Sequence, residues 1–184
     1  EEIRSSKISN RIVLDPGHGG FDPGAVGPSG LAEKDINLQI ALLAEDILQR
    51  EGYNVILTRK DDTFISLKDR VEMANKMEAL LFVSIHANSA NSAYSEGTET
   101  FIAPNKVASS QLLADSLQKN LLKELNRLDR GVKKENFYVI KYTNMPAALV
   151  EVAFVSNPHE ESLLVSNLFK EKAARAIAHG IMEY

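Results

Sequence analysis

The chain is 184 residues long, which is typical of one domain with a substantial hydrophobic core. It contains no cysteine, which excludes disulfides, thiolate metal sites and thiol nucleophiles. Its formal charge of −4 offers no basic field for nucleic acid, and no apolar run approaches the length of a membrane helix. We therefore expect a single domain over residues 1–184, with a polar lead-in at 1–10, no nucleic-acid partner and no membrane insertion. The polar start is compatible with a domain cut from a longer, secreted precursor.

Strands and helices alternate along the sequence. β-branched and apolar runs predict strands at residues 11–15, 53–59, 80–85, 98–103, 136–141 and 147–155. Helical spacing of apolar residues predicts helices from about 33 to 51, 66 to 77, 109 to 128 and 167 to 184, with a short helix after Asn157-Pro158. The loop at 16–30 is rich in glycine and proline, and long loops of this kind are usually functional.

This order of elements indicates the fold class. Alternating strands and helices, with a pair of strands near the end, predict an α/β three-layer sandwich. Its sheet would be mixed but mostly parallel, with about six strands flanked by helices. In such folds ligands bind beyond the carboxyl ends of the strands, so candidate functional residues are sought there.

Two of the four histidines follow predicted strands. His18 lies in the glycine-rich loop after the first strand, and His86 ends the strand that begins at residue 80. If both strands are central and parallel, the two imidazoles meet at one edge of the sheet. His159 and His179 lie in predicted helices, where ordinary structural or solvated roles suffice.

Two acidic residues also stand out. Glu151 interrupts an apolar strand, where a lone carboxylate is costly unless it is paired or functional. Glu33 opens the first helix, a position that the helix dipole also favours for structural reasons. Two imidazoles and one carboxylate suit a catalytic zinc ion, and a second carboxylate could then transfer the proton. His18, Glu33, His86 and Glu151 together supply such a set.

Other catalytic patterns are absent from the sequence. The glycine-rich loop lacks the third glycine of a dinucleotide-binding motif and the Gly-Lys-Ser/Thr ending of a P-loop. There is no Gly-x-Ser-x-Gly and no His-Glu-x-x-His.

Five segments together resemble the zinc-dependent N-acetylmuramoyl-L-alanine amidases of bacterial cell walls. They are residues 12–20, residues 22–25 with 33–38, residues 57–59, residues 84–88 and residues 151–157. The resemblance implies one zinc ion per chain, held by His18, Glu33 and His86, with Glu151 as catalytic acid/base. It also implies a hydrolase that cleaves the amide between N-acetylmuramic acid and the L-alanine of the peptidoglycan stem peptide, using metal-activated water.

The same resemblance implies an extracytoplasmic location, secreted or bound to the cell wall, and an autolysin-type role. Some periplasmic members carry a helix that blocks the zinc, but the segment 87–97 is short and polar, so we expect an open groove. We also expect a monomer that is fused to, or works with, wall-binding modules. Candidate substrate-binding residues on loops are Asn88, Arg130, Asn136 and Asn144, all of which also suit ordinary turns.

Two alternatives remain open from the sequence. One is a catalytically silent binding module that has kept the fold. The presence of His18, Glu33, His86 and Glu151 argues against it, since the loss of any of them would have supported it. The other is a zinc exopeptidase or deacetylase, since the same ligands serve many amide hydrolases.

Overall fold

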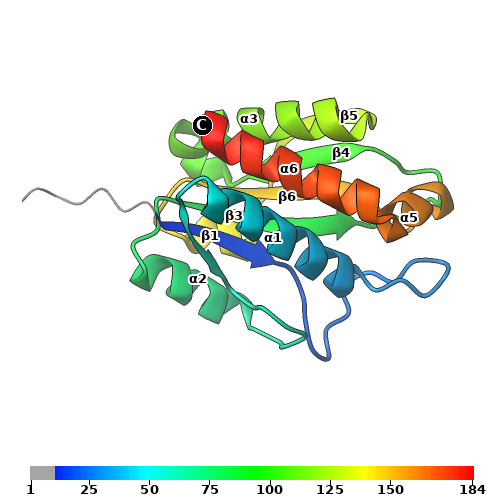
Figure 1. Cartoon of the computed structure of the whole chain (residues 1–184), viewed down its shortest axis with the longest axis horizontal. Helices are drawn as coiled ribbons and strands as arrows, with labels where there is room; N and C mark the ends of the chain where they lie inside the picture. Colours follow the sequence, from blue (N-terminus) through cyan, green and yellow to red (C-terminus); the bar gives the residue numbers. More distant parts are fainter. Residues whose placement is uncertain (1–10) are drawn as a thin grey trace, which may run out of the picture.

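The computed structural model describes residues 11–184, so the expected lead-in at 1–10 lies outside the described residues. A six-stranded sheet runs through the molecule with helices on both faces (Figure 1). The strands are β1 (Arg11–Pro16), β2 (Asn54–Leu57), β3 (Leu81–Asn88), β4 (Thr98–Ile102), β5 (Asp129–Lys134) and β6 (Ala147–Phe154). The helices are α1 (Glu33–Arg50), α2 (Leu67–Lys76), α3 (Val107–Leu125), α4 (Tyr138–Tyr142), α5 (Pro158–Val165) and α6 (Asn167–Glu183), with a 3-10 turn, η1 (Pro104–Lys106), before α3.

The sheet has the strand order β2-β1-β3-β6-β4-β5. The first four strands in this order are parallel to one another, whereas β4 is antiparallel to β6 and β5 is parallel to β4. The predicted class, a three-layer α/β sandwich with a mixed but mostly parallel sheet, is confirmed. The carboxyl ends of β1, β3 and β6 therefore meet at one edge, beside the amino ends of β4 and β5.

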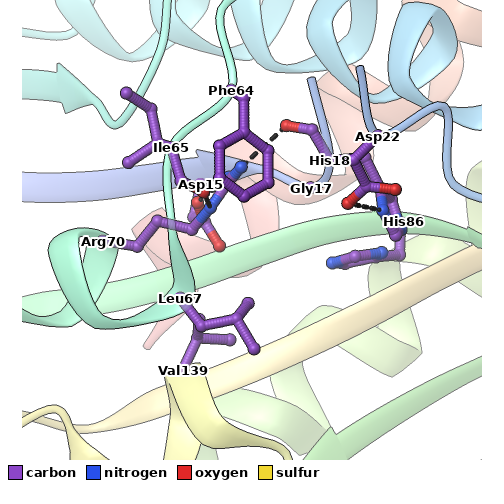
Figure 2. Close-up of a pocket in the computed structure, with 10 residues that line it drawn as sticks. All are labelled: Asp15, Gly17, His18, Asp22, Phe64, Ile65, Leu67, Arg70, His86 and Val139. Carbon is purple, nitrogen blue, oxygen red and sulfur yellow. Dashed lines mark hydrogen bonds and ion pairs between the residues drawn. The ribbon is translucent and has the colours of Figure 1, made fainter. Parts of the chain in front are cut away.

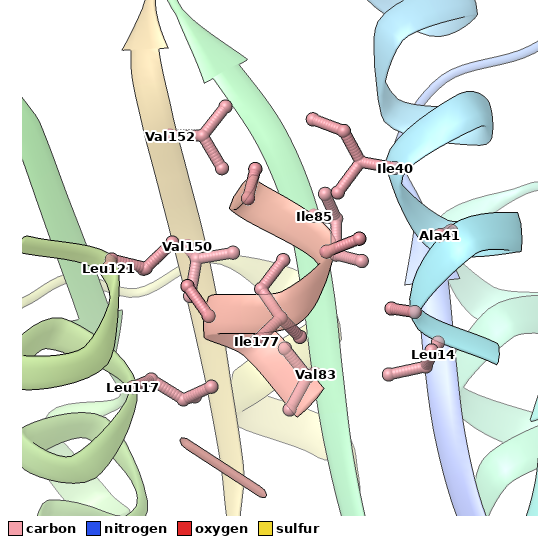
Figure 3. Packing of buried hydrophobic residues seen from close by; sticks show 14 of the residues in the cluster. Leu14, Ile40, Ala41, Val83, Ile85, Leu117, Leu121, Val150, Val152 and Ile177 are labelled. Atoms are coloured by element: carbon pink, nitrogen blue, oxygen red, sulfur yellow. The ribbon is translucent and has the colours of Figure 1, made fainter. Parts of the chain in front are cut away.

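One face of the sheet holds the larger core. Helices α1, α6 and α3 lie side by side over it (Figure 1), and α6 packs between the other two. Figure 3 shows this packing, in which Ile177 of α6 faces Val83 of β3 and Val150 of β6, all fully buried. The leucines that the helical spacing placed inward, at 113, 117, 121 and 125, are all buried on α3.

The other face is covered by α2 and α4 over only part of its length. Under these helices the strands present apolar side chains, among them Val13, Phe82 and Leu149. Because every second residue of a strand shares a face, the next inward positions are Asp15, Ser84 and Glu151, followed on β3 by His86. This face thus changes from apolar to polar toward the carboxyl edge of the parallel strands.

The strand expected at 136–141 is wrong. The strand lies earlier, as β5, and residues 138–142 form α4, which buries Val139 and Ile140 in the smaller core. A short apolar run does not distinguish a strand from a buried helical turn. β5 itself is an edge strand with no buried residue, and its basic residues hide the usual strand pattern.

The segment between β3 and β4 contains only turns and bends, with no helix over residues 89–97. No helix within residues 11–184 is long and apolar enough to cross a membrane.

Candidate active site

His18, Glu33 and His86 come together at the carboxyl edge of β1 and β3. One ligand atom from each of the three lies within 4.8 Å of those of the other two. His18 comes from the loop after β1, Glu33 from the first turn of α1 and His86 from the end of β3. The three residues predicted to bind metal are therefore neighbours in space, although Glu33 and His86 are 53 positions apart in the sequence.

The Glu33 carboxylate lies between the two imidazoles. Its Oε1 is 2.8 Å from His86 Nδ1, and its Oε2 is 3.2 Å from His18 Nε2. Backbone N–H groups of Ala25 and Ala87 donate to the same carboxylate. Burial acts to raise the pKa of Glu33, but the hydrogen bonds to both histidines outweigh it and hold the pKa well below its usual range. Glu33 is thus an anion fixed in position.

His18 is oriented by a second carboxylate. Its Nδ1 lies 2.8 Å from Asp22 Oδ2, which leaves Nε2 directed at Glu33. Burial opposes protonation of His18, but Glu33 and Asp22 outweigh it and raise its pKa. A histidine held at one ring nitrogen by a carboxylate is the usual arrangement behind a metal ligand. Sequence reasoning assigned no role to Asp22. Its place within the resembling segment 22–25 was the only indication that it could matter.

The loop before α1 has a strained, close-packed backbone. His18 has a φ of 61°, in the left-handed region that non-glycine residues rarely adopt. A Cβ on Gly24 would lie 2.6 Å from Glu33 Oε2, and a Cβ on Gly17 would collide with the His86 ring. These glycines therefore let the backbone approach the three side chains closely.

Two arginines hold this loop in place through hydrogen bonds to its carbonyl oxygens. The Arg70 guanidinium is almost completely buried, pairs with Asp15 at 2.7 Å and donates to the carbonyl oxygens of Pro16 and His18. Arg59 donates to the carbonyl oxygens of Pro16 and Gly17. Sequence reasoning assigned no role to either arginine, although Arg59 lies in the resembling segment 57–59, because the sequence does not show which carbonyl oxygens an arginine will contact.

Glu151 lies beside the three-residue group but outside it. It is the cross-strand partner of His86, on the neighbouring strand β6. Its side chain is buried, and among residues 11–184 its Oε2 finds no hydrogen-bond partner. Burial raises the pKa of Glu151 well above its ordinary value, and the charges of Glu33 and Glu99 add to this. A buried carboxyl oxygen without a partner, facing a polar edge, is unusual unless the group has a function.

The four candidate substrate-binding residues divide into two pairs. Asn88 and Arg130 meet at Glu99 of β4, to which Asn88 Nδ2 donates at 2.6 Å and Arg130 Nε at 2.8 Å. Asn136 and Asn144 are exposed, and neither lines the cleft described below. Sequence reasoning did not single out Glu99. An acidic residue inside a predicted strand is the feature that could have identified it.

The two remaining histidines lie away from this edge. His159 is exposed on α5 and His179 is half-buried on α6, and neither belongs to the three-residue group. Both therefore fit the structural or solvated roles expected for them.

A cleft of about 310 Å³ opens directly beside the two imidazoles. Figure 2 shows His18, Asp22 and His86 on one side of it, with Phe64, Leu67 and Val139 on the other. The cleft lies between the polar edge of the sheet and the helices on this face, since α2 supplies Leu67 and Arg70 to its lining and α4 supplies Val139. The expected open groove agrees with this cleft and with the short segment 89–97.

The donors present fit a zinc ion. Two imidazoles and one carboxylate are the protein ligands of many catalytic zinc sites, which keep a further position for water. Here the carboxylate is held as an anion, one imidazole is oriented by Asp22, and the glycines leave space around the ligand atoms. The side chains at this edge of the sheet are therefore of the types that form the metal centre of a metallohydrolase.

Comparison with known proteins agrees with this class. The family model described as N-acetylmuramoyl-L-alanine amidase matches residues 12–183. The N-acetylmuramoyl-L-alanine amidase LytC of Bacillus subtilis is 42% identical over 184 residues, which cover 100% of this chain and 37% of LytC. The solved catalytic domain of the amidase CwlV from Bacillus (Paenibacillus) polymyxa has 44% identity and a TM-score of 0.91, over 95% of this chain and 97% of that one. A solved amidase of Clostridium difficile 630 has 36% identity and a TM-score of 0.92, over 95% of both chains.

The chain belongs to the N-acetylmuramoyl-L-alanine amidase family, and the predicted family and class of enzyme are confirmed. It spans little more than a third of the length of LytC, so it corresponds to one part of that relative.

Proposed function

We propose that this chain is an amidase catalytic domain that hydrolyses the amide between N-acetylmuramic acid and L-alanine in peptidoglycan. The observation that supports this most is the group of His18, Glu33 and His86 at the cleft, with Glu151 on the next strand, whose Oε2 has no hydrogen-bond partner within residues 11–184. Family membership supplies the substrate class. The proposed domain comprises the whole sheet and the helices on both of its faces.

His18 through Nε2, Glu33 and His86 would hold one zinc ion. A zinc ion bound there would polarise the substrate carbonyl and lower the pKa of a bound water. Glu151 would take the proton of the attacking water and pass it to the departing amine of L-alanine. Its position supports this division, because the group of atoms within 4.8 Å of one another contains Glu33 and excludes Glu151. The raised pKa of Glu151 also suits a group that holds a proton part of the time.

Two substitutions separate the metal ligand from the proton carrier. Glu151→Gln keeps the shape of the side chain and touches none of the three ligands, so zinc content should persist while the rate falls by about a hundredfold or more. Glu33→Gln replaces an anionic ligand with a neutral one, so zinc affinity and rate should fall together. Elemental analysis and rates measured on both variants test the assignment. Loss of zinc from Glu151→Gln with retention by Glu33→Gln would reverse the two roles.

Mass spectrometry of digested peptidoglycan tests the reaction itself. An amidase releases intact stem peptides with a free L-alanine amino group, a deacetylase releases acetate, and a silent binding module releases neither. Acetate without free stem peptides would refute the proposed bond specificity.

We also propose that the domain acts outside the cytoplasm as a monomer, together with wall-binding modules. Its substrate lies there, and with a charge of −4 the domain itself gains no attraction to anionic wall polymers. Light scattering of the purified domain tests the monomer, and sedimentation with intact cell walls tests the need for a separate binding module.

A further inference from the structure

A row of charged side chains crosses the sheet from the candidate metal ligands to its far edge. His86 on β3 is the cross-strand partner of Glu151 on β6, and Glu151 is in turn the partner of Glu99 on β4. Residues paired across neighbouring strands project from the same face. Beyond Glu99, the edge strand β5 brings Arg130 and Lys133 to the same row. The row therefore begins at an imidazole and ends at two cations.

The cations share one carboxylate. Glu99 is 4% exposed, and its Oε2 accepts from both Arg130 Nε and Lys133 Nζ. The Arg130 and Lys133 side chains are 31% and 39% exposed, and the Arg130 guanidinium also lies 4.8 Å from the ring centre of Phe154. Two partly open cations on one buried anion leave a surplus of one positive charge facing solvent. A guanidinium has five donors; Arg130 Nε donates to Glu99 and Nη1 to the Glu96 carbonyl oxygen, which leaves Arg130 further donors for a second carboxylate.

The order of groups in this row sets the direction of the substrate. This step rests on the proposed function, in which the carbonyl lies at the metal ligands and the departing amine at Glu151. The stem peptide then extends from His86 past Glu151, toward Glu99 and the cations. Neighbouring strands are about 4.8 Å apart, so β4 lies roughly 10 Å from β3. Two extended residues span about 7 Å, which brings the second residue of the stem within reach of the Arg130 and Lys133 side chains.

The second residue of a peptidoglycan stem is a D-glutamyl residue linked through its γ-carboxyl group. Its α-carboxyl group is a free anion in some stems and an amide in others. We propose that Arg130 and Lys133 bind this α-carboxylate and make the enzyme prefer stems in which it is free. Asn88, which donates to the other oxygen of Glu99, keeps that carboxylate oriented toward the two cations.

A matched pair of substrates tests this specificity. Two muropeptides that differ only in whether the α-carboxyl group is free or amidated are compared by kcat/KM. We expect the unchanged protein to prefer the free acid by about tenfold, the scale of a partly exposed charge-assisted hydrogen bond. The double variant Arg130→Gln/Lys133→Gln should lose most of this preference. Lys134→Gln, which removes the same charge from the next, exposed residue of β5, should keep it.

The ratio of the kcat/KM values for the two substrates cancels any effect that a substitution has on both. Loss of either cation also alters Glu99 and, through it, Glu151, but this changes both rates alike and leaves the ratio untouched. A preference that stays the same in the double variant, or that is absent from the unchanged protein, would overturn the proposal.

A binding measurement separates this inference from the proposed function. The free peptide L-Ala-γ-D-Glu-L-Lys and its α-amide are titrated into the zinc-loaded protein by calorimetry. Tighter binding of the acid by the unchanged protein, lost in the double variant, would support carboxylate recognition even if the amide bond of muropeptides is not cleaved. Equal binding of both peptides would refute it even if cleavage is observed.

Discussion

Replacing Gly17 by alanine should weaken zinc binding without disturbing the backbone. Gly17 is not among the residues with a left-handed φ, so alanine can adopt its conformation. A Cβ there would lie 2.7 Å from His86 Nδ1, and nearer still to two other ring atoms, whereas ordinary contact begins at 3.4 Å. The closest ring atom, His86 Cε1, would lie 2.2 Å from the Cβ, so it must move by about 1.2 Å to reach 3.4 Å, and the adjoining cleft gives the ring room to do so.

Such a displacement is large on the scale of metal coordination. Ligand distances in zinc sites vary by only about 0.2 Å, so the displaced imidazole should cost about 10–100-fold in zinc affinity. Competition with a chelating indicator measures this affinity, and urea unfolding of the metal-free protein measures the stability of the fold.

Gly30→Ala is the matched control for this substitution. Gly30 has a φ of +91° and no atom within 4 Å of an added Cβ, so its alanine variant is strained but not crowded. It should lose about 1–2 kcal/mol of unfolding free energy and keep its zinc affinity. If Gly17→Ala binds zinc as tightly as the unchanged protein, the reasoning that this glycine sets the His86 position is refuted.

Two further predictions follow from the electrostatics of the site. Asp22→Ala removes the acceptor at His18 Nδ1, so zinc affinity should fall by about 10–100-fold. The pKa of His18 in the metal-free protein should fall too, and an imidazole pKa unchanged by NMR titration would contradict this. Because burial raises the pKa of Glu151, with Glu33 and Glu99 adding to it, the stability that Glu151 contributes is present at low pH and lost as pH rises through its folded-state pKa. Glu151→Gln should therefore stabilise the metal-free protein by about 1–3 kcal/mol near pH 8 but have little effect near pH 4, and an equal effect at both pH values in urea unfolding would refute this.

The sequence is enough to predict most of the fold and to identify candidate residues for the site, because both depend on local patterns. Apolar runs that end in Asp15-Pro16 and in His86 identify buried strands and place polar groups at their carboxyl ends. Glu151 stands out because a carboxylate in an apolar run has no ordinary structural explanation. Parallel strands share one edge, so the order of strands and helices along the chain is enough to predict that their terminal residues lie together.

Prediction from the sequence fails where the surrounding structure decides whether a segment becomes a strand or a helix. The run at 136–141 is apolar enough for a strand, but it forms α4 because the smaller core needs Val139 and Ile140 at that point. The actual strand, β5, pairs along one side only and buries none of its residues, so its charged sequence shows no strand period.

The supporting contacts of the site are decided by tertiary structure alone. Arg70 reaches Asp15 across 55 residues, and Arg130 reaches Glu99 across 31. Neither pair shows a spacing that a helix or a strand would produce. A charged side chain is compatible with many positions in a sequence, whereas its partner is fixed only when the strands have taken their order and register. For this reason the sequence identified the candidate residues for the chemistry, and only the packed structure showed which residues contact and orient them.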